Sequence, residues 1–437
     1  MSVNPRPERR TQPLRWLLGF VAATVCLSGP LVHGTEITDP RGARKDSGPL
    51  GIEWTAPLAS DDLRDGLACF DDRVYVSVGS TLTAFDRKGK QAFQFASPSR
   101  ELISVPTVLP SGVVVVADAR SSYGISPDGK SRWTKRFSSS GSQVEFMVPP
   151  PAVASNDGVV VFSAMDGKVH GVSGSSGRDL WESVVGRYSE TSPAIILGIV
   201  SKTAIVLAQP GGASDVEVRG IAITAKEASG TLRLKTKGQP STMIAGSGPG
   251  LVLSSYTEMH STRGTTVIET YDKKGRAKWT VERGRHDRPM AITESGELVV
   301  ASQDKDAKRA DTDLELWSPD GHMRRKATIQ GDVKFIAVGR ASKLIAVSCS
   351  GTETFVEELS GELHNVARLS LGPGCARAIS MNSNGDLFVA RVVDGAAPGG
   401  LPLSQLVAVS TGLAPAKGGW AMPRASSSGA ASVDISQ

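Results

Sequence analysis

The stretch PAVASNDGVVVFSAMDGKVHGVSGSSGRDLWESV, residues 151–184, contains the unit that decides the fold. Residues 151–154, 159–164, 169–173 and 179–182 are short apolar segments, and Asn, Asp, Ser and Gly fill the breaks between them. These residues suit tight hairpin turns, because Gly and Asn or Asp adopt positive φ at little cost. The pattern predicts four short antiparallel strands, which make one blade of a β-propeller.

The same unit recurs along the chain when its copies are aligned on the glycine of the last hairpin. Successive glycines are 40 to 53 residues apart, close to the period of four-stranded blades. They are Gly89, Gly129, Gly177, Gly230, Gly275, Gly321, Gly361 and Gly412. We therefore predict an all-β chain folded as an eight-bladed β-propeller of four-stranded antiparallel blades, with seven blades as the alternative.

Aromatic residues accompany these hairpins at a regular position. Phe93, Trp133, Trp181 and Trp279 each stand four residues after a hairpin glycine. This regularity predicts packing between neighbouring outer strands rather than a ligand cage. Trp54 lies in 51–55, which resembles a fourth strand without a preceding hairpin, so we expect that segment to complete the last blade and close the ring. Residues 420–422 are the alternative closing strand.

The N-terminus has the composition of an export signal, with four arginines before the apolar run 16–27. We predict a signal peptide over 1–34, a disordered linker over 35–50, the propeller over 51–425 and a disordered tail over 426–437. An uncleaved membrane anchor is the alternative. Lipoprotein anchoring at Cys26 is disfavoured, because Val25 is branched where that signal takes a small residue. The predicted location is periplasmic or secreted, with no membrane span after cleavage.

The charge argues against a nucleic-acid partner. The chain has a formal net charge of +5, and residues 1–34 contribute four Arg and one Glu, so 5 − 3 = +2 remains after cleavage. A basic stripe of the kind that binds nucleic acid is not evident in the sequence. We expect a monomer whose partners are proteins, peptides or glycans of the cell envelope.

Residues 167–182, GKVHGVSGSSGRDLWE, closely resemble the repeat of pyrroloquinoline-quinone-binding-like, or quinoprotein-type, propellers. Residues 126–133 and 271–279 are looser versions of it. The resemblance extends over residues 51–425 and implies the propeller fold. This repeat is shared by quinoprotein alcohol dehydrogenases and by non-enzymatic propellers, among them the outer-membrane-protein assembly lipoprotein.

The resemblance also implies what a dehydrogenase of this family would need. Those enzymes carry a vicinal Cys-Cys ring, a calcium or lanthanide site and a catalytic Asp. This sequence has no adjacent cysteines, and the metal ligands have no matching positions. We therefore expect the non-enzymatic branch, with no catalytic residues, no cofactor and no metal. A divergent quinone- or metal-dependent oxidoreductase and an outer-membrane protein assembly component are the alternatives to an envelope interaction scaffold.

One covalent link follows from the strand order. Cys349 ends the second predicted strand of copy 7, and Cys375 begins the first strand of copy 8. Antiparallel order places these two strand ends on the same face of adjacent blades. A Cys349–Cys375 disulfide is therefore possible, and it would leave Cys69 free.

The remaining polar motifs have ordinary explanations. The acidic pairs in 304–306 and 311–313 are interleaved with basic residues, which favours a solvated loop over a calcium site. The histidines lack metal-ligand spacing; they are His170, His260, His286, His322 and His364. The longer linkers between second and third strands, 209–218, 257–265, 303–312 and 394–404, all open onto one face. Binding loops on a rigid scaffold and neutral variation of tolerant loops both explain their length.

Overall fold

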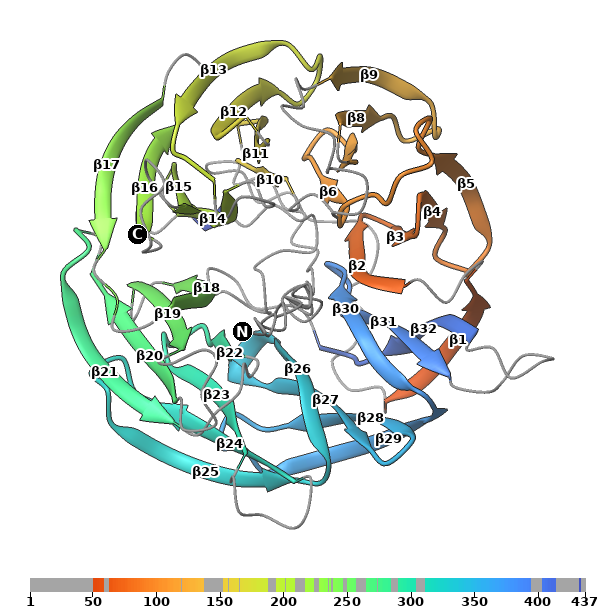
Figure 1. Ribbon diagram of the computed structural model, residues 1–437. Helices are drawn as coiled ribbons and strands as arrows, with labels where there is room; N and C mark the ends of the chain where they lie inside the picture. The colour runs from red at the N-terminus through yellow and green to blue at the C-terminus, as the bar shows by residue number, and fades with distance from the viewer. Residues whose placement is uncertain are drawn as a thin grey trace, which may run out of the picture.

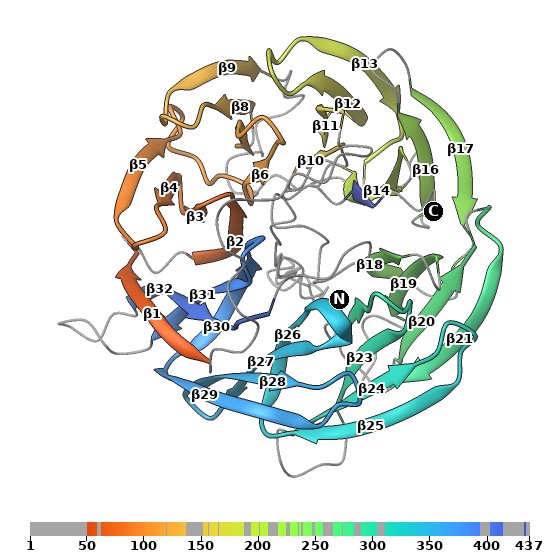
Figure 2. The ribbon, with the colours of Figure 1, turned by 180° about the vertical axis from the view of Figure 1, so that it is seen from behind.

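The chain forms a closed ring of eight β-sheets around a central axis (Figures 1 and 2). The computed structural model describes residues 50–58, 63–118, 120–136, 152–155, 157–164, 166–187, 194–200, 202–208, 217–223, 228–234, 236, 239–246, 250–256, 265–272, 274–283, 290–303, 311–393, 403–413 and 432–433. The predicted signal peptide, residues 35–49 of the predicted linker and most of the predicted tail lie outside these residues. Their boundaries stay a prediction.

Blades 1 to 4 follow one another along the chain, each running from its innermost strand outward (Figure 1). Blade 1 contains β2 (Leu63–Phe70), β3 (Arg73–Val78), β4 (Thr81–Phe85) and β5 (Gln91–Ala96). Blade 2 contains β6 (Thr107–Val108), β7 (Val114–Ala117), β8 (Ser121–Ile125) and β9 (Ser131–Arg136). Blade 3 contains β10 (Val153–Ala154), β11 (Val159–Ser163), β12 (Lys168–Ser173) and β13 (Asp179–Val184). Blade 4 contains β14 (Ile195–Val200), β15 (Thr203–Ala208), β16 (Glu217–Ile223) and β17 (Ala228–Leu234), and β33 (Ser432–Val433) adds in parallel to β14.

Blades 5 to 8 repeat the same order. Blade 5 contains β18 (Gln239–Gly246), β19 (Gly250–Tyr256), β20 (Thr266–Tyr271) and β21 (Ala277–Arg283). Blade 6 contains β22 (Met290–Ile292), β23 (Leu298–Ser302), β24 (Thr312–Trp317) and β25 (Met323–Ile329). Blade 7 contains β26 (Asp332–Val338), β27 (Leu344–Ser350), β28 (Glu353–Leu359) and β29 (Asn365–Pro373), with the 3₁₀ turn η3 (Arg340–Ser342) after β26. Blade 8 contains β30 (Cys375–Met381), β31 (Asp386–Val393) and β32 (Leu403–Ser410).

The first strand of the described chain closes the ring. β1 (Gly51–Pro57) pairs antiparallel with β32 and becomes the fourth strand of blade 8. This confirms the prediction that the segment around Trp54 completes the last blade, and it settles the blade number at eight. The alternative closing strand, 420–422, lies outside the described residues. Closure pairs β32, which would otherwise be the exposed edge of a three-stranded blade.

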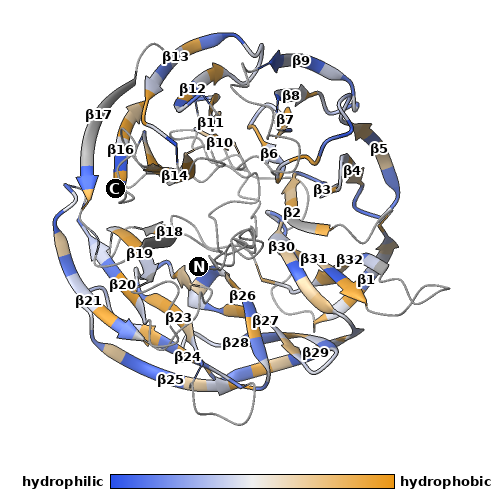
Figure 3. Ribbon diagram, in the orientation of Figure 1, coloured by the Kyte–Doolittle hydropathy of each residue, from blue (hydrophilic) through white to orange (hydrophobic). Residues whose placement is uncertain are grey.

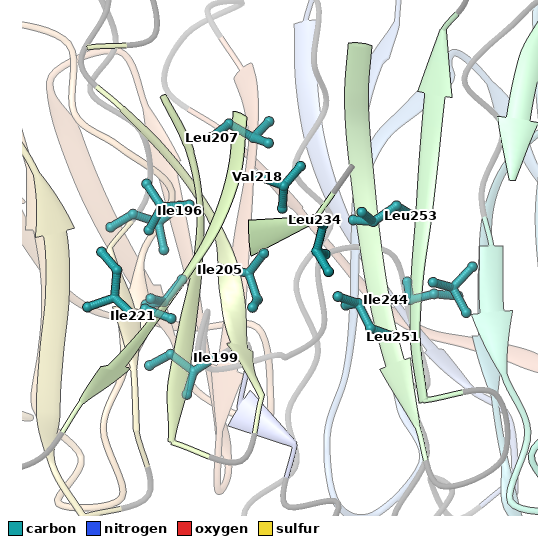
Figure 4. Close-up of a cluster of buried hydrophobic side chains, with 14 of the residues drawn as sticks. Ile196, Ile199, Ile205, Leu207, Val218, Ile221, Leu234, Ile244, Leu251 and Leu253 are labelled. Atoms are coloured by element: carbon teal, nitrogen blue, oxygen red, sulfur yellow. The ribbon is translucent and has the colours of Figure 1, made fainter. Parts of the chain in front are cut away.

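The core forms between blades rather than within one layer. Middle strands such as β27 are buried along almost their whole length, because neighbouring blades cover both of their faces. Outer strands such as β25 are mostly exposed. Figure 3 shows this shift from apolar inner strands to polar outer strands. In Figure 4, Ile205 and Leu234 of blade 4 lie beside Ile244 and Leu251 of blade 5 in one cluster of buried side chains.

The hairpin aromatics hold each blade to the next. A Cβ atom on Gly177 of blade 3 would lie 2.7 Å from the Trp133 ring of blade 2, so only glycine lets the ring approach this closely. The Trp133 indole Nε1 also donates a hydrogen bond to the Gly174 carbonyl, at 2.9 Å. Phe93 contacts Gly129 in the same way, and Trp279 contacts Gly321. The predicted packing role of these aromatics is confirmed.

Three of the eight predicted hairpin glycines differ from the structure. Gly412 follows β32, whose outer neighbour is β1 from the other end of the chain, so no hairpin joins these two strands. Gly230 lies inside β17, opposite Ile221 at a β-bulge, so the hairpin of blade 4 comes earlier in the sequence. In blade 7 the left-handed turn position belongs to Leu363, with φ of 62°, and not to Gly361. All three differences fall in copies whose local sequence departs from the repeat. A turn can move by a few residues, or place its left-handed position on a non-glycine residue, while the strands on either side keep their order.

The two faces of the ring differ in the length of their connections. We call the hairpin face the one that carries the connections from first to second and from third to fourth strands. At most five residues separate consecutive strands there, as in 86–90 and 126–130. We call the opposite side the loop face. It carries the connections from second to third strands and from blade to blade, and these extend to longer segments such as 137–152.

In the described part of the chain, no helix is long and apolar enough to cross a bilayer.

Candidate functional site

The loop-face end of blades 6 to 8 is built from two equivalent junctions. Thr312 at the start of β24 donates its hydroxyl to the Gly331 carbonyl at 2.9 Å, and Thr354 in β28 donates to the Gly374 carbonyl at 2.5 Å. Each glycine lies just before the inner strand of the next blade, with positive φ. The two threonines therefore fix where β26 and β30 begin.

The inner strands after these junctions share a β-bulge. The register of β26 shifts between Val333 and Phe335, and that of β30 shifts between Ala376 and Ala378. The skipped residues are Lys334 and Arg377, and both side chains are exposed. A bulge turns a side chain away from the regular alternation of a strand and is common at functional surfaces. Two basic residues thus stand at equivalent positions near the loop-face end of the innermost strands.

These two basic residues differ in their partners. Lys334 Nζ forms an ion pair with Asp332 Oδ2 at 2.5 Å, one blade before Arg377. Cys375 takes the position in β30 that Asp332 has in β26, because both residues open the ladder to the second strand of their blade. The Arg377 guanidinium therefore has the Cys375 thiol in place of the aspartate. We call Lys334, Arg377, Asp332, Cys349 and Cys375 the inner basic cluster.

The two cysteines of this cluster are in contact. In the structure both are free thiols, and a hydrogen bond joins their side chains. That hydrogen bond from Cys349, followed by the charges of Lys334 and Arg377, lowers the pKa of Cys375 to about 7. The same hydrogen bond, with burial, raises the pKa of Cys349. The strand geometry on which the disulfide prediction depends is present, and the disulfide itself stays a prediction.

Cys69 corrects one part of that prediction. It was expected to be free, whereas it is disulfide-bonded in the structure. Its side chain is fully buried, and its sulfur lies 3.1 Å from Ser380 Oγ. Strand order alone pairs only cysteines that lie on adjacent strand ends, so it gave no information on Cys69.

The predicted histidine and acidic motifs do not form a common site in the described part of the chain. His170 is buried in blade 3, where it bonds Asp166 at 3.0 Å and stacks on Phe162. Asp311 accepts the Gly331 amide, and Asp313 pairs with Lys326. His322 and His364 are exposed on separate hairpins, whereas His260, His286, Asp304 and Asp306 lie outside the described residues. A search of the described residues finds no group of three or more His, Cys, Asp or Glu able to hold a metal ion.

One buried carboxylate was missed by the sequence analysis. Asp118 on the loop face of blade 2 accepts hydrogen bonds from the hydroxyls of Ser97, Ser99 and Tyr123 at 2.6–2.8 Å. Its other oxygen accepts the amides of Arg120 and Ser121. Five donors satisfy both oxygens, so Asp118 ties two connections of the loop face together and leaves no lone pair for a ligand. In the sequence, the only local indication of this role is that Asp118 lies three residues before Ser121, whose amide it accepts.

Eight four-stranded blades closed by an N-terminal strand define the class of this protein as an eight-bladed β-propeller. The family model described as "Outer membrane protein assembly factor BamB" matches residues 51–280, which are 230 of the 437 residues. The chain belongs to this BamB-like family of PQQ-like propellers. None of the curated proteins matches the chain in sequence.

Solved structures agree with this fold. The BamB structure from Moraxella catarrhalis is similar with a TM-score of 0.50 and 12% identity, over 83% of this chain and 99% of that one. Quinohemoprotein alcohol dehydrogenase from Comamonas testosteroni is similar with a TM-score of 0.54 and 10% identity, over 82% and 76%. The C-terminal WD40 domain of Sif2 is similar with a TM-score of 0.55 and 11% identity, over 82% and 98%. At these identities the likeness shows the fold alone.

Proposed function

We propose that this chain is an exported, non-enzymatic interaction scaffold of the cell envelope that binds protein partners through its loop face. The observation that carries the proposal is the difference between the two faces. Connections on the hairpin face are uniformly short, whereas those on the loop face vary in length from blade to blade. Variable loops on a rigid frame are where binding residues usually lie.

The inner basic cluster supports an acidic segment of a partner as the ligand. Lys334 and Arg377 are exposed on neighbouring inner strands, and Lys334 also pairs with Asp332. An arginine can bind a carboxylate through two parallel hydrogen bonds, which adds geometry to charge. Membership of a family described by an outer-membrane assembly factor supports a protein as the partner. The apolar run and basic residues of 1–34 support export.

Site-specific photo-crosslinking in envelope extract tests this proposal. A crosslinking amino acid is placed at Thr352 or Arg377 on the loop face, and at Lys88 or Asn384 on the hairpin face as matched controls. All four residues are exposed. We expect a defined crosslinked protein from the loop-face positions only. Equal yields from both faces, or crosslinks from the hairpin face alone, would contradict the proposal.

Charge reversal then tests the acidic ligand. Arg377→Glu should weaken capture of the crosslinked partner about tenfold or more, since it replaces attraction with repulsion at the centre of the contact. Lys88→Glu, which changes net charge by the same amount on the opposite face, is the control. Equal effects of the two variants would show that net charge matters and not this cluster.

A second candidate is a subunit of outer-membrane protein assembly. The family description and the similar BamB structure favour it. Co-purification of the mature chain with the envelope machinery that assembles β-barrels is the expected result, and Arg377→Glu should reduce it. Recovery of a defined partner without that machinery would exclude this candidate while leaving the scaffold proposal intact. Reduction of an electron-accepting dye on addition of quinone, calcium and an alcohol would contradict the non-enzymatic assignment.

A further inference from the structure

We propose that Cys349 and Cys375 form a thiol pair that reacts with an external disulfide and closes into a covalent link between blades 7 and 8. Cys375 is the attacking thiol, and Cys349 is the thiol that resolves the intermediate. Both cysteines belong to the inner basic cluster, but this inference does not rest on the proposed function, because the reaction and its test need no partner protein.

Hydrogen bonds between the chain segments next to the two cysteines hold blade 7 to blade 8. The Gly374 amide donates to the Thr352 carbonyl at 2.6 Å, and the Thr354 hydroxyl donates to the Gly374 carbonyl at 2.5 Å. Cys375 follows Gly374 directly, and Cys349 pairs with Thr354 in the ladder between β27 and β28. The backbone on both sides of the pair is therefore fixed before any bond forms.

The two thiols are neighbours across the seam, on the contacting strands β27 and β30. The Cys375 thiol is the main influence on the pKa of Cys349, and the Ala376 amide is another, so both groups of blade 8 lie beside Cys349. Conversion of this contact to a disulfide needs only an approach of the two sulfurs, since their strands already face each other. The residue of blade 8 equivalent to Cys349 is Val392, and the residue of blade 7 equivalent to Cys375 is Asp332. In these two blades the cysteine pair is therefore confined to this seam.

The surroundings assign the two thiols different roles. Cys349 is 6% exposed, whereas Cys375 is partly exposed, so an external disulfide reaches Cys375 first. Lys334 and Arg377 stabilise negative charge on the Cys375 sulfur, and hydrogen bonding from Cys349 does the same. A thiolate in a basic, partly exposed environment is the usual attacking group in thiol–disulfide exchange.

The reaction balances with a disulfide compound as the oxidant. The Cys375 thiolate attacks one sulfur of the external disulfide, the S–S bond of that compound breaks, and its other half leaves as a thiolate that takes up a proton. Cys349 then loses its proton, and its sulfur attacks Cys375 in the mixed disulfide and releases the second half as a thiol. Two protein thiols are oxidised, and one external disulfide is reduced to two thiols.

The experiment uses the purified full chain, reduced, freed of reductant and treated with oxidised glutathione. Remaining thiols are alkylated, and peptide mass mapping scores Cys349, Cys375 and Cys69 separately. We expect one peptide pair linked through Cys349 and Cys375. Alkylation of both thiols after treatment would overturn the proposal.

Single variants separate the two roles. Cys349→Val is the matched variant, because the equivalent position in blade 8 is Val392, and it should trap glutathione on Cys375. In Cys375→Ser, Cys349 should react at least tenfold more slowly than Cys375 does in Cys349→Val. Circular dichroism and a thermal melt confirm that each variant is folded. Faster reaction at Cys349 than at Cys375 would overturn the assigned order.

Discussion

Replacement of Trp54 by Ala tests whether one non-covalent seam holds the ring closed. Trp54 lies on β1, the strand that the N-terminal end contributes to blade 8. Its indole ring lies 5.9 Å from the Phe388 ring of blade 8 and 6.4 Å from the Phe85 ring of blade 1, between centroids. Its Nε1 donates to the Arg87 carbonyl at 2.8 Å, and a Cβ on Gly89 would lie 2.6 Å from the ring. Trp54 therefore connects blade 8 to blade 1.

The expected loss of stability follows from these contacts. An indole buries about 200 Å² when fully enclosed, and Trp54 is half-buried, so about 100 Å² returns to water. At about 25 cal/mol per Å² this costs about 2.5 kcal/mol, and loss of the hydrogen bond adds about 0.5–1 kcal/mol. The total of about 3 kcal/mol corresponds to a fall in Tm of about 4 °C for a propeller of this length.

The assay compares Trp54→Ala with Trp133→Ala. Trp133 occupies the equivalent place between blades 2 and 3, where the chain itself continues from one blade to the next. Both variants should lower the urea midpoint and Tm. Only Trp54→Ala should also speed limited proteolysis near β1, because β1 is held to β32 by pairing and packing alone. A Trp54→Ala variant with unchanged Tm, or with the proteolysis pattern of Trp133→Ala, would refute the account of ring closure.

Two further predictions concern single positions in blade 3. Gly177→Ala should lower the free energy of unfolding by about 2 kcal/mol or more, because a Cβ would meet the Trp133 ring at 2.7 Å and φ is +68°. The control in the same urea titrations is Gly158→Ala, where φ is +84° and a Cβ would meet nothing within 4 Å. This control should show the smaller cost of backbone strain alone. Burial lowers the pKa of His170 in the folded chain despite the opposing charge of Asp166, so the unfolded chain binds the proton more tightly, and stability should fall as pH drops below about 6.5. His170→Gln should flatten that fall between pH 7 and pH 5, and an unchanged slope would show that other groups cause it.

The repeat could be predicted from the sequence because its turns are local. Glycines such as Gly129 and Gly177 adopt positive φ in the structure, and the strands around them alternate with turns at fixed spacing. Trp54 indicated the closing strand, because it is the aromatic residue typical of a fourth strand and no hairpin precedes it. Strand order also placed Cys349 and Cys375 at one seam, since an antiparallel blade fixes which strand ends share a face.

The rest depends on contacts between blades, which one sequence does not show. Lys334 and Arg377 belong to the inner basic cluster only because a β-bulge shifts the register of each inner strand, and neither bulge has a glycine or proline to mark it. Asp118 collects its donors from the preceding connection, so its role needs the folded loop face. The hairpin of blade 4 was misplaced because Gly230 matched the spacing while lying in a strand.

The structure of the ring explains why function should concentrate on one face. In the described residues, four seams between blades pack an aromatic ring on a glycine near the hairpin face, as at Trp133 and Gly177, and the connections there are short. On the loop face, blades 7 and 8 are joined by the bonds of Thr352 and Thr354 to Gly374, and the connections on this face vary in length. Beside the inner basic cluster, the bond of Thr354 to Gly374 fixes the backbone, while the Arg377 side chain remains exposed. A propeller divided in this way can change its partner without losing its closure, which is why the fold alone does not specify the ligand.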